Sequence, residues 1–110
     1  MQDRVLSLLG IAAKAGKTAS GGFSVEEAVR SRKAKLVLIA GDALTNTTKR
    51  FTDKCGHYKV PYRFYGSKEA IGHALGKQPR ACVAVLDRGL AENILKLLPG
   101  DGHSGEGDSS

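Results

Sequence analysis

The sequence predicts an α/β protein in which helices cover both faces of a four-stranded sheet. Three observations lead to this fold class: helical and extended patterns alternate along the chain, two extended segments are continuous apolar runs, and 110 residues suit one domain. Continuous apolar runs indicate strands that are buried on both faces. We expect residues 1–98 to form the domain and residues 99–110, which are rich in Gly and Ser, to be a disordered acidic tail.

The first expected element is a helix over residues 4–15, because Val5, Leu9 and other apolar residues recur at helical spacing. This helix bears on the stretch LLGIAAKAGKTASGG, which has some features of a phosphate-binding loop. Such a loop has four residues between its first glycine and Gly-Lys-Thr, and it follows a strand. Here five residues separate Gly10 from Gly16, and a helix precedes them. The spacing and the preceding helix therefore argue against nucleotide hydrolysis.

A short extended piece at residues 17–20 and a Gly-Gly pair lead to the second expected helix. Ser24 followed three residues later by Glu27 has the capping-box pattern, which predicts Ser24 as the N-cap. The apolar run KLVLIAG at residues 35–41 then predicts a central strand.

The second half of the chain repeats this alternation. Leu44, Thr48, Phe51 and Cys55 share one face of an expected helix, and Gly56 is expected to end it. The remaining expected elements are a strand at residues 61–66 that begins with Pro, a short helix capped by Ser67, a buried strand at residues 81–87 and a closing helix up to residue 98.

The charge of the chain favours a polyanionic partner. The full chain carries +6, but residues 1–98 hold all 17 basic and only 8 of the acidic residues, which gives +9. The alternative is that the basic surface serves solubility alone. No apolar run approaches the roughly 20 residues of a membrane span, and the N-terminus lacks a signal-peptide layout. We therefore expect a cytoplasmic protein without a membrane partner.

The cysteine and histidine residues do not form a recognisable catalytic or metal-binding pattern. Cys55 and Cys82 lie in apolar segments, so we expect reduced thiols in the core. Cys55 and His57 are close in sequence, but no third or fourth ligand has a spacing that suits zinc. His73 is expected on the surface of a helix. We expect no catalytic residue, metal or cofactor.

The Gly21-Gly22 pair marks the first candidate binding loop. Glycine lets the backbone approach a ligand closely, and the N-terminus of the next helix favours a phosphate. Lys14 and Lys17 precede this loop in sequence and are expected to add positive charge to it. The alternative is a tight strand-to-helix turn that needs glycine only for its dihedral angles.

A second candidate loop, residues 75–81, joins the short helix to the last strand. Its Lys77, Gln78 and Arg80 surround Pro79, and polar donors on a stiffened loop suit contacts to phosphates and base edges. An ordinary surface turn has a similar composition.

Several segments in order resemble one family. AKLVLIAGDA, CGHYKVPYRFYGSKEAIGHALG and CVAVLD are similar to the kink-turn RNA-binding superfamily of ribosomal and small nucleolar ribonucleoproteins, and within it to the bacterial YlxQ-like ribosomal proteins. The match covers about residues 6–98. The resemblance implies a three-layer α-β-α sandwich with a mixed sheet, no enzyme activity and binding to structured RNA, with ribosomal RNA as the expected partner. We also expect a monomer. Ribosomal or translation-factor proteins are further partners that the resemblance allows.

The resemblance also implies which residues contact the RNA. Position by position it assigns backbone contact to Gly16, Lys17, Gly21 and Lys68. However, Phe23 and Ser24 stand where the family has the Asn and Glu that read G·A pairs, and Gln78-Pro79-Arg80 replaces the usual apolar loop.

Phe23 and Arg80 are the expected substitutes for the missing readers. Phe23 could stack on an unpaired base, or it could instead pack on its own helix as a hydrophobic staple. Arg80 could reach a phosphate or a guanine edge. The sequence thus favours a protein that binds bent or internally looped RNA. The alternative is a protein-interaction adaptor of a translation complex that does not contact RNA.

Overall fold

The computed structural model describes residues 3–98, and the expected tail at residues 99–110 lies outside them. Five helices and four strands alternate along the chain in the expected order. They are α1 (Arg4–Lys14), β1 (Thr18–Ser20), α2 (Gly22–Arg30), β2 (Leu36–Ile39), α3 (Thr45–Tyr58), β3 (Tyr62–Phe64), α4 (Lys68–Leu75), β4 (Cys82–Val85) and α5 (Arg88–Leu97).

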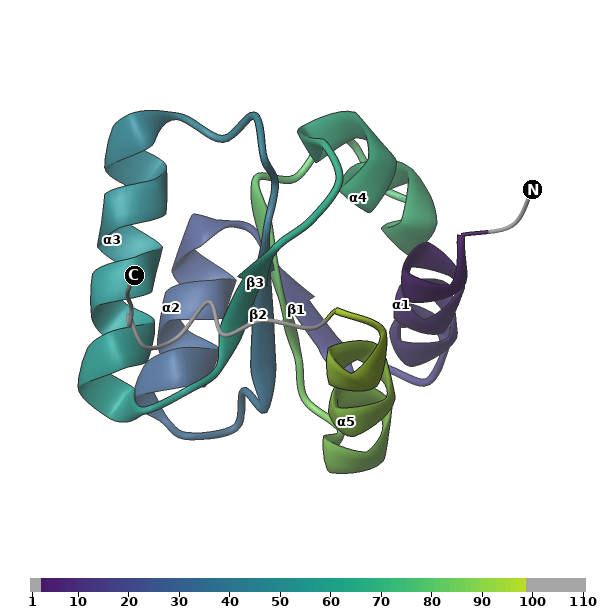
Figure 1. The fold of residues 1–110 in the computed structure, drawn as a ribbon, viewed down its shortest axis with the longest axis horizontal. Coiled ribbons are helices and arrows are strands. Elements are labelled where there is room, and N and C mark those ends of the chain that lie inside the picture. The colour runs from purple at the N-terminus through teal and green to yellow at the C-terminus, as the bar shows by residue number, and fades with distance from the viewer. Residues whose placement is uncertain (1–2, 99–110) are drawn as a thin grey trace.

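The four strands form one mixed sheet in the order β1-β4-β2-β3. Strand β4 is antiparallel to both of its neighbours, whereas β2 and β3 are parallel. Helices α2 and α3 cover one face of the sheet, and α1, α4 and α5 cover the other (Figure 1). The expected three-layer sandwich with a mixed sheet is therefore confirmed.

The two central strands explain why the apolar runs are continuous. All residues of β2 and β4 are buried, as expected. Along β2, Leu36 and Leu38 join the core under α1, α4 and α5, while Val37 and Ile39 join the core under α2 and α3. Because successive side chains of a strand point to opposite faces, a strand between two helical layers must be apolar at every position.

The structure corrects the expected start of α2. The helix begins at Gly22, and its N-cap is Gly21 rather than Ser24. Gly21 has φ 89° and ψ 154°, a backbone conformation that essentially only glycine adopts, so the turn is set by this residue. Ser24 lies exposed in the first turn, and the Glu27 carboxylate accepts a hydrogen bond from Arg30 instead of closing a capping box.

The expected end of α3 was also wrong. The helix continues through Gly56 to Tyr58 and ends at Lys59, which adopts the left-handed conformation with φ 59°. The Val60 N–H then donates to the Cys55 carbonyl at 2.9 Å. This hydrogen bond accompanies burial of the Val60 side chain, and the burial favours ending the helix at Lys59 over ending it at Gly56. Leu44 is the N-cap of α3 and is exposed, so it does not share the buried face.

Both cysteines are buried, unbonded thiols, as expected. Burial raises the pKa of Cys55 to about 12 and that of Cys82 to about 11. Neutral thiols of this kind are poor nucleophiles at physiological pH. His57 and His73 are both exposed. Within residues 3–98, no group of three His, Cys, Asp or Glu side chains could hold a metal ion, and no helix has the length and hydropathy to cross a membrane.

Gly72 allows the loop between α4 and β4 to pack on α4. A Cβ at this position would lie 2.7 Å from the Pro79 Cα and 2.7 Å from the Gln78 carbonyl carbon. Real Cβ atoms do not approach backbone so closely, so any side chain at residue 72 must displace the loop.

We expect Gly72→Ala to lower the free energy of unfolding by roughly 1–3 kcal/mol, the usual cost of overpacking. Gly56→Ala is the matched control, because a Cβ there meets no atom within 4 Å. Removing a glycine from a helix interior should raise the same free energy by about 0.5–1 kcal/mol. Urea unfolding measures both values. Equal effects of the two substitutions would contradict the close packing of the loop.

Candidate nucleic-acid interface

The sheet topology gathers four connections at one edge of the sheet. Because β4 is antiparallel to β1 and β2, its N-terminal end lies beside their C-terminal ends, and β3 ends at the same side because it is parallel to β2. We call this the loop edge and define it as residues 20–22, 40–44, 65–67 and 76–81. The Gly41 N–H donates to the Gly66 carbonyl at 2.8 Å, which joins two of these connections.

Arg80 joins the two loops that were singled out from the sequence. Its Nε donates to Ser20 Oγ at 3.2 Å, and its Nη1 donates to the carbonyls of Gln78 and Pro79 at 3.1 and 3.2 Å. Its backbone N–H donates to the Lys68 carbonyl at 3.0 Å. Nε therefore holds the loop against β1, while Nη1 bonds carbonyls within the loop itself. Arg80 is therefore a positioning residue. Within residues 3–98, Nη2 is the one guanidinium nitrogen without a hydrogen bond, so it alone is left for an outside partner.

Two of the five helices begin without a side-chain cap, and both begin at the loop edge. Asp3, Ser67 and Asp87 cap the first turns of α1, α4 and α5 through their side-chain oxygens. Gly21 and Leu44, the N-caps of α2 and α3, make no such bond. Helices α2 and α3 also pack together on the same face of the sheet. Uncapped N–H groups at a helix start favour anions, so the starts of α2 and α3 are candidate anion-binding positions.

The first turn of α2 presents an aromatic ring to solvent. Phe23 is 81% exposed, so the expectation that it packs as a hydrophobic staple is wrong. No acceptor within residues 3–98 is bonded to the N–H groups of residues 22–24. Exposed aromatic rings stack on nucleic-acid bases, and free N–H groups bind phosphate or base edges. Residues 22–24 therefore offer both free N–H donors and an exposed aromatic ring.

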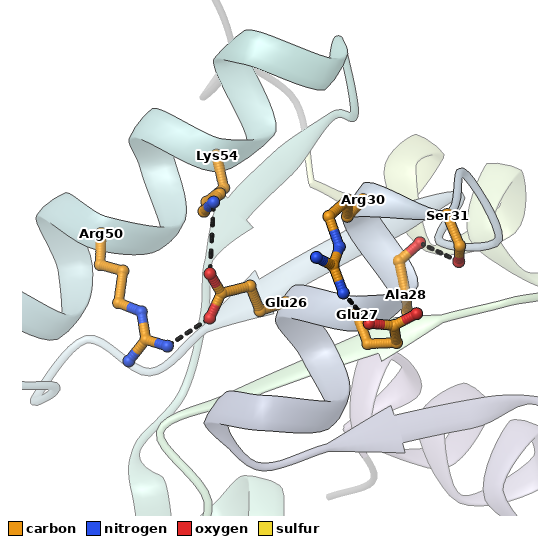
Figure 2. Close-up of polar contacts among 7 residues, drawn as sticks. All are labelled: Glu26, Glu27, Ala28, Arg30, Ser31, Arg50 and Lys54. Atoms are coloured by element: carbon orange, nitrogen blue, oxygen red, sulfur yellow. Dashed lines mark hydrogen bonds and ion pairs between the residues drawn. The ribbon is translucent and has the colours of Figure 1, made fainter.

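Arg50 lies beside this turn, and the sequence did not indicate it. A Cβ built on Gly22 would lie 3.9 Å from Arg50 Nη1, which places the guanidinium next to the start of α2. Figure 2 shows Arg50 and Lys54 of α3 both reaching Glu26 of α2. The hydrogen bond from Arg50, followed by that from Lys54, lowers the pKa of the Glu26 carboxyl. Two cations around one carboxylate leave net positive charge beside the loop edge.

The remaining residues expected to contact RNA divide between the loop edge and the other end of the sheet. Lys77 and Gln78 are exposed on the loop. Lys68, the first residue of α4, borders the loop edge, and its N–H donates to Asp42 Oδ1 at 2.8 Å. In contrast, the Lys17 carbonyl accepts the N–H of Leu86, beyond the C-terminal end of β4. The structure therefore does not bring Lys17 to the loop edge.

Lys14 and Gly16 share this distant position. Lys14 is the last residue of α1, and Gly16 has φ 72° in the turn that leads from α1 into β1. Since β1 separates this turn from Gly21, neither residue lies at the loop edge. Any role of these residues in RNA contact would need a second area of contact.

Together, the fold and the loop edge define a small α/β protein with a glycine-containing edge suited to phosphate and base contacts. Residues 3–95 match the Ribosomal protein L7Ae/L30e/S12e/Gadd45 family, and the chain belongs to this family. The resemblance noted from the sequence is thereby confirmed.

Two curated relatives carry the same name. The RNA-binding protein YlxQ of Bacillus subtilis (strain 168) is 46% identical over 91 residues, which cover 83% of this chain and 91% of the relative. The RNA-binding protein YlxQ of Enterococcus faecium is 34% identical over 99 residues, which cover 90% of this chain and 95% of the relative.

Solved structures show the same fold. A protein of unknown function from Bacillus halodurans is similar with a TM-score of 0.84 and 35% identity, over 87% of this chain and 97% of that chain. The Giardia lamblia 15.5kD RNA binding protein is similar with a TM-score of 0.73 and 25% identity, over 88% of this chain and 86% of that chain.

We expect Gly21→Ala to lower the free energy of unfolding by roughly 1–3 kcal/mol, because alanine is strained in this backbone conformation. Gly22→Ala is the control, since Gly22 is helical and its Cβ would make only ordinary contacts at 3.9 Å. The Gly22→Ala substitution should change the free energy of unfolding by less than about 1 kcal/mol. Thermal unfolding of the two variants measures the difference, and equal losses would contradict the special role of Gly21.

Proposed function

We propose that this protein is a non-enzymatic RNA-binding protein that contacts structured RNA through the loop edge. The single observation that carries the proposal is the first turn of α2, where unbonded N–H groups, the exposed Phe23 ring and the Arg50 guanidinium lie together. Family membership and the names of the relatives support it.

The shape of the loop edge favours a bent RNA over a straight duplex. The loop held by Arg80 and the first turn of α2 lie at the ends of adjacent strands, so both can contact one RNA feature from two sides. A kink-turn or related internal loop exposes backbone on both sides of a bend and carries unpaired bases. We propose such an element, within ribosomal RNA, as the partner.

Backbone N–H groups would supply hydrogen-bond donors in place of the side-chain amide of the absent Asn, but they do not replace the acceptor oxygens of the absent Glu. The N–H groups of residues 22–24 point out of the helix start, and Phe23 offers a stacking surface that tolerates any base. Recognition of this kind would depend on the bend of the RNA and less on base identity.

The test is a binding titration with a kink-turn RNA and with a control in which Watson–Crick pairs replace the tandem G·A pairs. We expect roughly tenfold tighter binding to the kink-turn, because lost specific contacts cost about 1–3 kcal/mol. The logarithm of affinity should fall linearly with the logarithm of salt concentration, by about 0.7–0.9 per phosphate contacted. Equal binding to both RNAs would contradict kink-turn recognition, and salt-insensitive binding would contradict backbone contact.

Phe23→Ala should weaken binding of the kink-turn RNA by roughly 1–3 kcal/mol, the contribution of one base stacked on an aromatic ring. Stability should not change, because the ring is 81% exposed. Ile11→Ala is the control, since Ile11 is also an exposed apolar side chain but lies on α1. Anisotropy titrations and urea unfolding measure the two effects. A loss of stability with unchanged RNA affinity would mean that Phe23 serves the fold.

A further inference from the structure

A second basic site lies at the end of the sheet opposite the loop edge. It is a hollow of about 360 Å³ between the turn after α2, the C-terminal end of α3 and the first half of α5. Its cationic side chains are Arg32, Lys35, Lys59 and Arg88, and Glu92 is its only carboxylate. We call this hollow the basic cavity. The Lys35 N–H donates to the Val85 carbonyl at 2.8 Å, which places the cavity at the C-terminal end of β4.

The cations of the basic cavity are not neutralised within the part of the chain that the structure describes. No carboxylate of residues 3–98 lies within ion-pair distance of any of the four. The Lys35 amine instead donates weakly to the Arg32 carbonyl at 3.5 Å, and the Arg32 guanidinium lies 5.9 Å from the centroid of the Tyr58 ring. Four cations with one carboxylate form a site for an anion.

The backbone gives an independent reason to regard this cavity as a site. Arg32 and Lys59 are the two non-glycine residues of the described chain with positive φ, at 65° and 59°, and both line the cavity. Each lies just after a helix, where glycine is the favoured residue because it adopts this conformation without strain. The chain thus has a long cation at two positions where glycine would stabilise the turn. Strained residues of this kind gather at functional sites.

The lining of the basic cavity selects the class of ligand. Val60, Pro61 and Leu95 are apolar members of the lining, and Tyr58 adds an aromatic ring. A lone inorganic anion would gain nothing from these apolar groups, whereas a nucleotide unit of RNA combines a phosphate with a base that packs on apolar and aromatic groups.

The cavity and the loop edge are separated by the sheet. The four residues of β2 span roughly 13 Å at the usual rise per residue. One RNA strand or a second segment of the same RNA can therefore occupy the cavity while the loop edge is filled. Lys17 also lies at this end, since its carbonyl bonds the N–H that follows β4.

We propose that the basic cavity binds a single-stranded RNA segment through its phosphodiester backbone and one base, independently of the RNA at the loop edge. The protein would then hold two RNA segments at opposite ends of its sheet. This inference goes beyond the proposed function and does not require that the loop edge recognises a kink-turn.

The test uses the full chain and a fluorescent ten-nucleotide oligouridylate, titrated with and without saturating kink-turn RNA. The main variant is Arg32→Gly with Lys59→Gly, which removes two cations and relieves the backbone at both positions. We expect oligouridylate binding to weaken roughly tenfold, in line with the loss of two charge-assisted contacts. Stability in urea should be unchanged or higher, and affinity for the kink-turn RNA should be unchanged.

Two further variants separate the effect of the cavity cations from effects of the backbone and of total charge. Lys35→Gln with Arg88→Gln removes the other two cations without touching a left-handed residue, and it should weaken the oligonucleotide to a similar extent. Arg4→Gln with Lys96→Gln is the charge-matched control outside both areas and should leave binding unchanged.

Each remaining outcome would overturn the proposal. Displacement of the oligouridylate by kink-turn RNA would place both ligands at the loop edge. Equal weakening by the cavity variants and the control would show a general charge effect. Binding of adenosine monophosphate as tight as that of the oligonucleotide would identify a free nucleotide as the ligand. If kink-turn RNA does not bind at all, the titration without it still tests the cavity, so the two proposals fail separately.

Discussion

The arrangement of this protein depends on the last strand lying in the middle of the sheet. β4 is inserted between β1 and β2, antiparallel to both, and every one of its residues is buried. This insertion brings a loop from late in the chain beside the start of α2, about sixty residues earlier, where Arg80 bonds Ser20. It also sends α5 back along the other end, where it forms one wall of the basic cavity. Both proposed binding areas are therefore consequences of a single strand placement.

The sequence was informative where one local rule dominates. The apolar runs predicted β2 and β4 because a strand between two helical layers has no solvent face, and Ser67 predicted the start of α4 because its hydroxyl accepts the Ala70 N–H. It failed where two rules compete. At Ser24 a plausible capping box lost to the N-cap Gly21, three residues earlier, and at Gly56 a plausible helix end lost to the burial of Val60.

Much of the candidate site could not be predicted for a different reason. The Gly21 loop and the loop before β4 were both singled out from composition, but their contact depends on strand order, which no local pattern encodes. The same holds for Arg50, whose position beside α2 depends on the packing of two helices and on its bond to Glu26. Sequence proximity was misleading for Lys14 and Lys17, since three residues of strand carry the chain away from them.

The close packing of the Gln78 carbonyl on Gly72 of α4 has a consequence for how the protein meets its ligand. The loop is fixed against α4 at Gly72 and against β1 by Arg80, and α4 in turn packs on α1. A loop held at two points has little freedom to lose when a ligand arrives, so little conformational entropy opposes association. Encounter with a correctly bent RNA would then resemble the meeting of two rigid bodies, with the adjustment left to the RNA.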